Sequence, residues 1–288
     1  MKIGIFGSTG LIAVELKNEL EGLGHCVVRF SRNPKKEMGL NSYNSLSQIE
    51  DLGLIVNLAG DHPKNQSGPS HPSVYDLDNL GCEWSIKTGR PYVFVSSGSV
   101  FGKSSIGPVS QTSSYTDYGL CDDYTRTKLD LERRHLALRV NGDMVSDLRI
   151  FSYAGPLFIQ NGNYFLSELF SASQSNREIT ITGSDFLRDY IGARELAQAV
   201  MKLGGGSEPL SHNLSSLKPA SKQEILDIFS SQVGLRYEWK SSTPRQVKAV
   251  DYYCAEFSDK LGGYHPRYSI DVIRGALKGL LYKRVHLN

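Results

Sequence analysis

The chain has 288 residues, of which 40% are apolar and 10% aromatic, which is enough to bury a sizeable core and excludes a disordered protein. Its 32 basic and 30 acidic residues leave a net charge of +2, so charge points to neither a nucleic-acid nor a membrane partner. No apolar run is long enough to span a bilayer, and "MKIGIFG" enters a strand directly instead of a secretory signal, so we expect a cytoplasmic protein.

Short apolar runs alternate with helical patterns over the first half of the chain. The predicted strands cover 2–6, 26–30, 54–58, 92–96 and 147–151. Helices are predicted between the first two strands, ending near Gly24, and over 74–88 and 123–140. This alternation predicts an α/β fold with a doubly wound, Rossmann-type parallel sheet, right-handed crossovers and helices on both faces.

The second half is more irregular. Short strands are predicted at 179–183 and 188–192, and helices at 193–204, 222–234 and 269–282. The four cysteines, Cys26, Cys82, Cys121 and Cys254, are scattered without a C-x-x-C pair, and the seven histidines are equally dispersed. We therefore predict neither a disulfide framework nor a metal centre.

The segment "GIFGSTG" joins the first predicted strand to the first predicted helix. A tight turn, a close approach of the backbone to a pyrophosphate and close helix–strand packing are all needed there, and glycine permits each of them. The N–H groups at the start of the helix suit an anion. The expected cofactor contacts are Gly4, Gly7, Ser8, Thr9, Gly10, Leu11 and Ile12.

The end of the second strand, "VVRFSR", bears on the choice of cofactor. An acidic residue there accepts from a free ribose hydroxyl, whereas an arginine accommodates a 2′-phosphate. Ser31 stands at the acidic position and Arg32 follows, so the sequence favours NADP (NADPH) over NAD. The alternative is that Arg32 is an ordinary exposed loop residue.

The segment "YTRTK" places Tyr124 and Lys128 four residues apart in a predicted helix. One helical turn puts both side chains on the same face, with Cβ atoms about 5–6 Å apart. Taken alone, this is an ordinary surface pair.

Together these motifs resemble the extended short-chain dehydrogenase/reductases, the NAD(P)-dependent epimerase/dehydratase family, over nearly the whole length. "GIFGSTG" is similar to G-x-x-G-x-x-G, "VSSGSVFG" (95–102) to S-S-x-x-V-Y-G, "YTRTK" to Y-x-x-x-K, and "RDYIGARELA" (188–197) to R-D-F-V-x-V-D-D-x-A. The resemblance implies catalytic roles for Ser97, Tyr124 and Lys128. It further implies cofactor contacts by Leu58, Ala59, Gly60, Asn79, Tyr124 and Lys128.

The resemblance also implies two domains and a nucleotide-sugar substrate. We assign 1–156 plus 189–217 to a dinucleotide-binding domain, and 157–188 plus 218–288 to a smaller substrate-binding α/β lobe. The expected substrate contacts are Ser97, Ser99, Ser152 and Arg188. Arg188 has the alternative of an ion pair with Asp189 or Glu195, and segment 103–123 either covers the active site or is a solvated loop.

Some positions depart from the family pattern. Phe101 replaces the tyrosine of V-Y-G, Ser152 stands where many sugar-nucleotide members have asparagine, and Arg194-Glu195 replaces a double aspartate. The aspartate motif that contacts adenine is lacking between the second and fourth strands. Because of these departures, the sequence supports the prediction of a cofactor-binding fold more strongly than the prediction of a particular substrate.

The resemblance gives the four-residue spacing of Tyr124 and Lys128 a catalytic interpretation. A tyrosine is a poor acid–base catalyst at its ordinary pKa of about 10, and we expect the Lys128 ammonium and an oxidised nicotinamide to lower the pKa of Tyr124. Ser97 would polarise the substrate oxygen that Tyr124 protonates. By resemblance, Lys128 would also hold the nicotinamide ribose.

The leading hypothesis is an NADPH-dependent reductase of a nucleotide-linked 4-keto-6-deoxy sugar. Gly98 and Ser99 stand where dehydratases of the family carry an acidic pair, and no cysteine lies near Ser97 in sequence for combined epimerisation and reduction. The alternative enzyme is an NAD-dependent nucleotide-sugar 4-epimerase. An alternative of another class is an NADP-sensing or RNA-associated relative without catalysis, against which the intact Ser–Tyr–Lys set and the near-neutral charge argue. Relatives commonly dimerise through helices of the cofactor domain, so we expect a homodimer.

Overall fold

The computed structural model describes residues 1–32, 39–49, 51–60, 73–102, 108–240 and 261–286. The strands are β1 (Lys2–Phe6), β2 (Cys26–Phe30), β3 (Leu40–Asn41), β4 (Leu52–Asn57), β5 (Tyr92–Ser97), β6 (Val145–Ile150), β7 (Ser152–Tyr153), β8 (Ile179–Thr182), β9 (Leu187–Arg188), β10 (Tyr190–Ile191), β11 (Ser211–Leu214), β12 (Ala220–Ser221) and β13 (Tyr237–Lys240). The α-helices are α1 (Leu11–Gly22), α2 (Val74–Thr88), α3 (Asp123–Val140), α4 (Pro156–Asn161), α5 (Phe165–Gln174), α6 (Ala193–Gly204), α7 (Lys222–Val233) and α8 (Ser269–His286).

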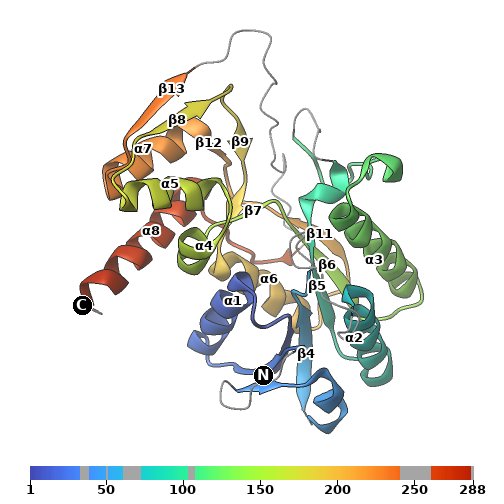
Figure 1. Ribbon diagram of the computed structural model, residues 1–288. Helices are drawn as coiled ribbons and strands as arrows, with labels where there is room; N and C mark the ends of the chain where they lie inside the picture. The colour runs from blue at the N-terminus through green and yellow to red at the C-terminus, as the bar shows by residue number, and fades with distance from the viewer. Residues whose placement is uncertain (33–38, 50, 61–72, 103–107, 241–260, 287–288) are drawn as a thin grey trace.

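A seven-stranded sheet forms the centre of the larger part of the molecule (Figure 1). Its order is β11-β6-β5-β4-β1-β2-β3, and every neighbouring pair is parallel. The order reverses between β1 and β4, and in sheets of this kind ligands bind beyond the carboxyl ends of the strands at that point. The predicted doubly wound α/β fold is confirmed.

Alternation along the strands sends side chains to both helical layers. Ile3 and Ile5 of β1 join the core on the side of α1 and α6, whereas Phe6 joins the core on the side of α2 and α3. Because successive residues of a strand point to opposite faces, a strand covered on both faces needs an almost continuous apolar run. The run "KIGIF" satisfies that requirement.

Capping residues begin and end the helices near the site. Ser73 starts α2 in a capping box with Asp76, and Gly89 ends that helix with a left-handed φ of 65°. Asp122 caps α3, and its side chain accepts a hydrogen bond from the N–H of Thr125 at 2.9 Å. This cap places Tyr124 in the first turn of α3.

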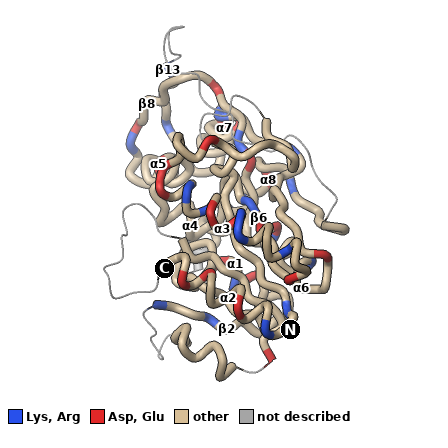
Figure 2. The backbone as a smooth tube through the Cα atoms, turned by 90° about the vertical axis from the view of Figure 1, so that its right-hand side faces the viewer, with Lys and Arg blue, Asp and Glu red and all other residues tan. Residues whose placement is uncertain are grey.

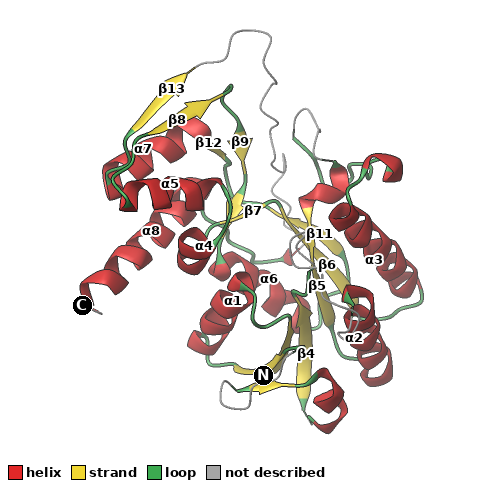
Figure 3. Cartoon of the chain, in the orientation of Figure 1, coloured by secondary structure: helices red, strands yellow, loops and turns green. Residues whose placement is uncertain are grey.

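A second, smaller part has a core of its own, at the upper left of Figure 1. Its apolar residues come from α5, α7, α8 and β8, including Phe170, Phe229, Ile273 and Ile181. Strand β8 pairs in parallel with β13. Helices α4 and α5 and the strand β13 were not predicted from the sequence (Figure 3). The domain boundaries given above stay a prediction.

The predicted strand at 188–192 is divided in the structure. Arg188 belongs to β9, which pairs antiparallel with β12, whereas Tyr190 and Ile191 form β10, which pairs in parallel with β7. Between them, the Asp189 carboxylate accepts the N–H of Ser216 at 2.7 Å. One short segment therefore joins two small sheets.

Two further observations concern the surface. No helix among the described residues is long and apolar enough to cross a membrane. Basic and acidic residues are interspersed along the described chain (Figure 2), as the near-neutral net charge implies.

Candidate functional site

The glycine turn lies at the carboxyl end of β1, against the segment that follows β4. Gly7 has a φ of +68°, and a Cβ atom built on it would lie 2.7 Å from the backbone nitrogen of Ala59. The neighbouring N–H of Leu58 donates to the carbonyl of Phe6 at 3.1 Å. Only glycine combines this conformation with so close a backbone contact.

The first turn of α1 follows immediately. Gly10 is its N-cap residue and no side chain caps this helix, which lies entirely within the described chain. Thr9 and Gly10 are exposed, and Leu11 and Ile12 are half-buried. This N-terminus therefore offers backbone N–H groups suited to a phosphate, and the cofactor contacts expected of these residues stay a prediction.

The end of β2 adjoins the same turn. Ser8 is buried, and its hydroxyl donates to the carbonyl of Phe30 at 2.7 Å. The N–H of the buried Ser31 donates to the carbonyl of Asn41 at 3.0 Å, and Arg32 is half-buried. The end of β2 thus lies next to the turn, and the cofactor contacts expected of Ser31 and Arg32 stay a prediction.

Tyr43 is a residue of this region that sequence reasoning missed. Its hydroxyl accepts the N–H of Gly7 at 3.0 Å, and its ring packs edge-on against Phe6 at 5.0 Å between centroids. Burial raises the pKa of Tyr43, although the Gly7 N–H and the Arg32 charge act to lower it. Tyr43 therefore lies against the glycine turn and within the influence of the Arg32 charge. No sequence signal marks it beyond an aromatic residue after a short strand.

The predicted catalytic residues meet where β5 ends beside α3. Ser97 is the last residue of β5, and a hydrogen bond joins its side chain to that of Tyr124. The buried Lys128 donates from Nζ to the carbonyl of Val95 at 2.9 Å. Its ammonium also lies 4.1 Å from the ring centroid of Phe94 and 5.8 Å from that of Tyr124.

The expected lowering of the Tyr124 pKa is wrong for this structure. Burial raises the pKa of Tyr124 because the phenolate loses water, and the hydrogen bond with Ser97 opposes that rise only in part. Tyr164 and Asp122 raise it further by their charges. The Lys128 ammonium donates to the Val95 carbonyl and lies near the ring faces of Phe94 and Tyr124. Tyr164, at the start of α5, was also missed.

The predicted substrate contacts come from three places. Ser99 is 5% exposed, and its buried hydroxyl has no hydrogen-bond partner among the described residues. The N–H of Ser99 donates to the Ser97 hydroxyl at 3.1 Å. Ser152 is the register partner of Tyr190 between β7 and β10. The guanidinium of Arg188 lies 4.4 Å from the Phe186 ring centroid and hydrogen-bonds the Tyr190 side chain.

The alternative ion pair of Arg188 with Glu195 is not formed. Glu195 accepts from Arg267 at 2.7 and 3.0 Å, and it also accepts from the N–H of Gly192, the N-cap residue of α6, at 3.0 Å. Burial acts to raise the pKa of Glu195, but Arg267 outweighs it and lowers the pKa. The Nε of Arg188 is buried without a partner among the described residues.

A buried ion pair supports the wall next to Ser97. Arg149 of β6 donates to Glu132 of α3 at 2.7 Å, and both side chains are almost fully buried. The Ser96 hydroxyl donates to Glu132 at 2.5 Å, and Tyr115 donates to the same carboxylate at 2.9 Å. Phe101 stacks on Tyr115, so its apolar ring has a packing role. Of the predicted covering segment, residues 103–107 lie outside the described residues.

Asn79 is half-buried in α2, and its predicted cofactor contact stays a prediction. A cavity of about 410 Å³ lies between α1, α4, α6 and α8, and none of the predicted site residues lines it. The carboxyl edge of the sheet, where the glycine turn and the Ser–Tyr–Lys group lie, is therefore the candidate site on chemical grounds.

Comparisons with known proteins agree with the motifs. A family model described as "NAD dependent epimerase/dehydratase family" matches residues 3–205. Among curated proteins, none matches the chain. Similar solved structures include MoeE5 in complex with UDP-glucose and NAD (23% identity, 100% of each chain covered, TM-score 0.75). They also include UDP-glucose 4-epimerase from Thermotoga maritima (16%, 99% of this chain and 100% of that chain, 0.77) and UDP-N-acetylglucosamine 4-epimerase from Bacillus cereus (16%, 97% and 99%, 0.74). At these identities the structural matches show a shared fold.

Proposed function

Because this chain belongs to the NAD-dependent epimerase/dehydratase family, we propose that it transfers a hydride at a carbon of a nucleotide-linked sugar. The observation that carries this proposal is the grouping of Ser97, Tyr124 and Lys128 at the carboxyl edge of the sheet. A regulator that only senses the cofactor has no use for this group.

In the proposed reaction, the protein's residues handle a proton and a developing charge. When bound, the nicotinamide cofactor supplies or accepts the hydride. Tyr124, kept protonated by burial, donates its proton to the substrate oxygen, and Ser97 hydrogen-bonds the same oxygen. Lys128, already anchored on Val95, supplies a fixed positive charge beside the tyrosine ring.

We propose a 4-keto-6-deoxy sugar linked to a nucleotide as the substrate. The buried Ser99 hydroxyl and the Arg188 Nε, both without partners among the described residues, suit contacts with the substrate's oxygens. Dehydration needs acidic residues after Ser97, but a side chain on Gly98 would meet the Phe151 ring at 2.6 Å. Cys121, which sequence places far from Ser97, is buried with Phe101, and its thiol donates to the Asp117 carbonyl. Because the Cys121 thiol already donates this hydrogen bond, the structure argues against its use as the acid in a combined epimerisation and reduction.

The cofactor in this proposal is NADPH. Ser31 at the end of β2 brings no negative charge, and the charge of the half-buried Arg32 acts against the rise that burial causes in the pKa of Tyr43. A guanidinium fixed at this edge suits a 2′-phosphate.

The second candidate function is 4-epimerisation with retained NAD. It is favoured by the likeness to structures described as UDP-sugar 4-epimerases and by the family description, which names NAD. An epimerase needs no outside reductant, because the hydride that it removes returns to the same carbon.

One experiment separates the two. The purified protein is mixed with a panel of nucleotide-linked 4-keto sugars and NADPH, and the loss of absorbance and the product are recorded. We expect NADPH consumption; tightly held NAD together with interconversion of a UDP-sugar in the absence of added cofactor would select the epimerase. If the protein binds cofactor but shows neither activity, the result would favour a non-catalytic relative.

The cofactor preference has its own test. We expect tighter binding of NADPH than of NADH, with roughly a tenfold or larger loss of NADPH affinity in Arg32→Ala, since hydrogen bonds to charged groups contribute about 1.5–3 kcal/mol. Ser31→Asp should reverse the preference. Equal affinities of the wild type at one ionic strength would contradict the NADP assignment.

We also propose a homodimer formed through α2 and α3. These helices lie side by side on one face of the sheet (Figure 1), joined by a hydrogen bond from Tyr75 to Asp130. Their outer surfaces expose Ile86, Leu136 and Val140, at 51%, 53% and 79%. Sedimentation of the wild type and of Leu136→Glu tests this: a dimer that the charge does not weaken would place the interface elsewhere.

A further inference from the structure

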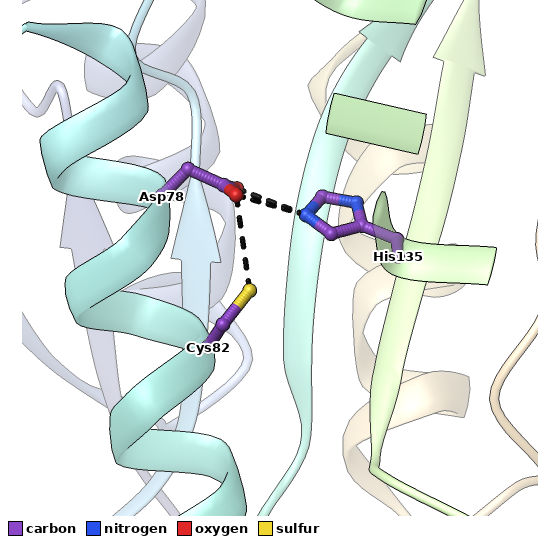
Figure 4. A group of neighbouring side chains, drawn as sticks. All are labelled: Asp78, Cys82 and His135. Atoms are coloured by element: carbon purple, nitrogen blue, oxygen red, sulfur yellow. Dashed lines mark hydrogen bonds and ion pairs between the residues drawn. The ribbon is translucent and has the colours of Figure 1, made fainter. Parts of the chain in front are cut away.

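A buried charged network lies between α2, α3 and β6. Asp78, His135 and Asp147 are completely buried. His135 Nδ1 lies 2.6 Å from Asp147, and its Nε2 lies 3.0 and 3.1 Å from the two oxygens of Asp78 (Figure 4). Asp147 also accepts from Arg139 at 2.7 Å and from the Ser211 hydroxyl at 2.8 Å.

Two carboxylates facing both nitrogens of one ring require a proton on each nitrogen. Burial acts to lower the pKa of His135, but Asp147 and Asp78 outweigh it and raise the pKa well above its ordinary value. His135 is therefore assigned as an imidazolium, and although burial acts to raise the pKa of Asp147, His135 and Arg139 outweigh it and lower that pKa. Asp78 also faces Arg134, whose Nη1 lies 3.6 Å from Oδ2.

Asp78, Cys82 and His135 are also residue types that bind metals, and their ligand atoms lie within 4.8 Å of one another. However, zinc would need a thiolate and a ring nitrogen without a proton. Burial raises the pKa of the Cys82 thiol, and the thiol lies 3.8 Å from Asp78 as a donor. The donor contacts of Cys82 and His135 to Asp78 therefore favour protons over a metal in this group.

A line of hydrogen bonds connects Asp78 with the cofactor edge of the sheet. The Tyr92 hydroxyl donates to Asp78 Oδ1 at 2.6 Å, and Asn57 Nδ2 donates to the Tyr92 oxygen at 2.7 Å. Asn57 Oδ1 then accepts the N–H of Ala59 at 2.8 Å. Gly81 leaves room for the Tyr92 ring, because a Cβ atom there would lie 2.2 Å from it.

Asp78 at one end of this line accepts and the backbone N–H of Ala59 at the other end donates, so the two ends together fix the direction of every bond between them. A carboxylate only accepts, so Tyr92 donates to it and turns its lone pairs toward Asn57. Asn57 must then present its NH₂ group to Tyr92 and its carbonyl to Ala59. Ala59 is the residue whose backbone touches Gly7 in the glycine turn.

We propose that Asp78, fixed in place by His135, is a positioning residue for the cofactor site, acting through Tyr92 and Asn57 on the backbone of Ala59. The line fixes residues 58–60 against Gly7, so that both turns are preformed before a dinucleotide binds. This inference rests on the cofactor site proposed above.

The test removes one hydroxyl and compares it with a matched control. Tyr92→Phe breaks the line, whereas Tyr264→Phe removes the hydroxyl of another buried tyrosine, which donates to the carbonyl of Ser215 at 3.1 Å. Fluorescence titration gives the dissociation constants of NADPH and NADH, and urea unfolding gives the stability of each variant. We expect Tyr92→Phe, which removes the two hydrogen bonds of this hydroxyl, to weaken cofactor binding by about five- to tenfold, with kcat at saturating cofactor unchanged. Tyr264→Phe should lose comparable stability and no affinity.

Asp78→Asn supplies a second test, because it keeps the side-chain volume and removes the charge. It should weaken cofactor binding at least as much as Tyr92→Phe. If the wild type binds cofactor and Tyr92→Phe binds it equally well, the positioning role is refuted while the cofactor site stands. A wild type that binds neither nucleotide would refute the cofactor site itself, and this inference with it. Stoichiometric zinc in the purified wild type, lost in Cys82→Ser, would overturn the assignment of protons.

Discussion

Replacing Gly7 by alanine should damage both stability and cofactor binding. The residue has a φ of +68°, and an L side chain in the left-handed region costs about 1–2 kcal/mol. Its Cβ atom would also lie 2.7 and 2.8 Å from backbone atoms of Ala59 and 2.9 Å from the carbonyl carbon of Leu58. These neighbours cannot rotate away as a side chain could, and overpacking of this kind costs about 1–3 kcal/mol. The expected loss in the free energy of unfolding is therefore roughly 2–5 kcal/mol.

Gly89→Ala is the matched control. Gly89 has nearly the same conformation, with a φ of +65°, but nothing lies within 4 Å of its built Cβ atom. The two variants share the conformational cost, so the difference between their urea midpoints, at equal slopes, isolates the contact with Ala59. Cofactor titration should show weaker binding in Gly7→Ala alone. Equal midpoints and equal affinities in the two variants would refute the close contact between the two turns.

Three further changes test the chemistry and the buried charges. Tyr124→Phe should lower kcat by about 10²–10⁴-fold, the usual worth of a general acid, while cofactor still binds; a near-normal rate would remove Tyr124 from the reaction. Lys128→Met should lower both the rate and the cofactor affinity, because it removes a fixed charge beside the tyrosine and a predicted ribose contact, and a loss of stability alone would make Lys128 structural. His135→Gln tests the buried imidazolium: since the folded-state pKa of His135 is raised, its stabilisation is complete below about pH 6.5 and is lost as the pH rises toward the folded value. The gap in unfolding free energy between wild type and His135→Gln should therefore narrow above about pH 6.5, and a gap independent of pH would contradict the assignment.

Local patterns were sufficient for most of the sheet and its helices. The predicted elements at 2–6, 26–30, 74–88, 123–140 and 193–204 agree with β1, β2, α2, α3 and α6. Buried parallel strands need continuous apolar runs, and helix ends need caps, so both leave signals within a few residues. The glycine turn and the Ser–Tyr–Lys group were also readable, since each depends on residues close together in the chain or on a known motif.

The features that the sequence did not predict depend on contacts between residues that are distant in the chain. The hydroxyl of Tyr43 reaches Gly7 across 36 positions, Asp78 faces His135 across 57, and Tyr153 donates to Glu15 across 138. None of these pairs has a local pattern, because a polar side chain looks the same in sequence whether water or a buried partner satisfies it. The pKa of Tyr124 likewise depends on contacts between residues that are distant in the sequence. The four-residue spacing correctly put Lys128 on the same helix face, but the environment of the phenol depends on which segments fold over it. Burial depends on the whole tertiary structure, so only the folded chain determines that the pKa of Tyr124 rises.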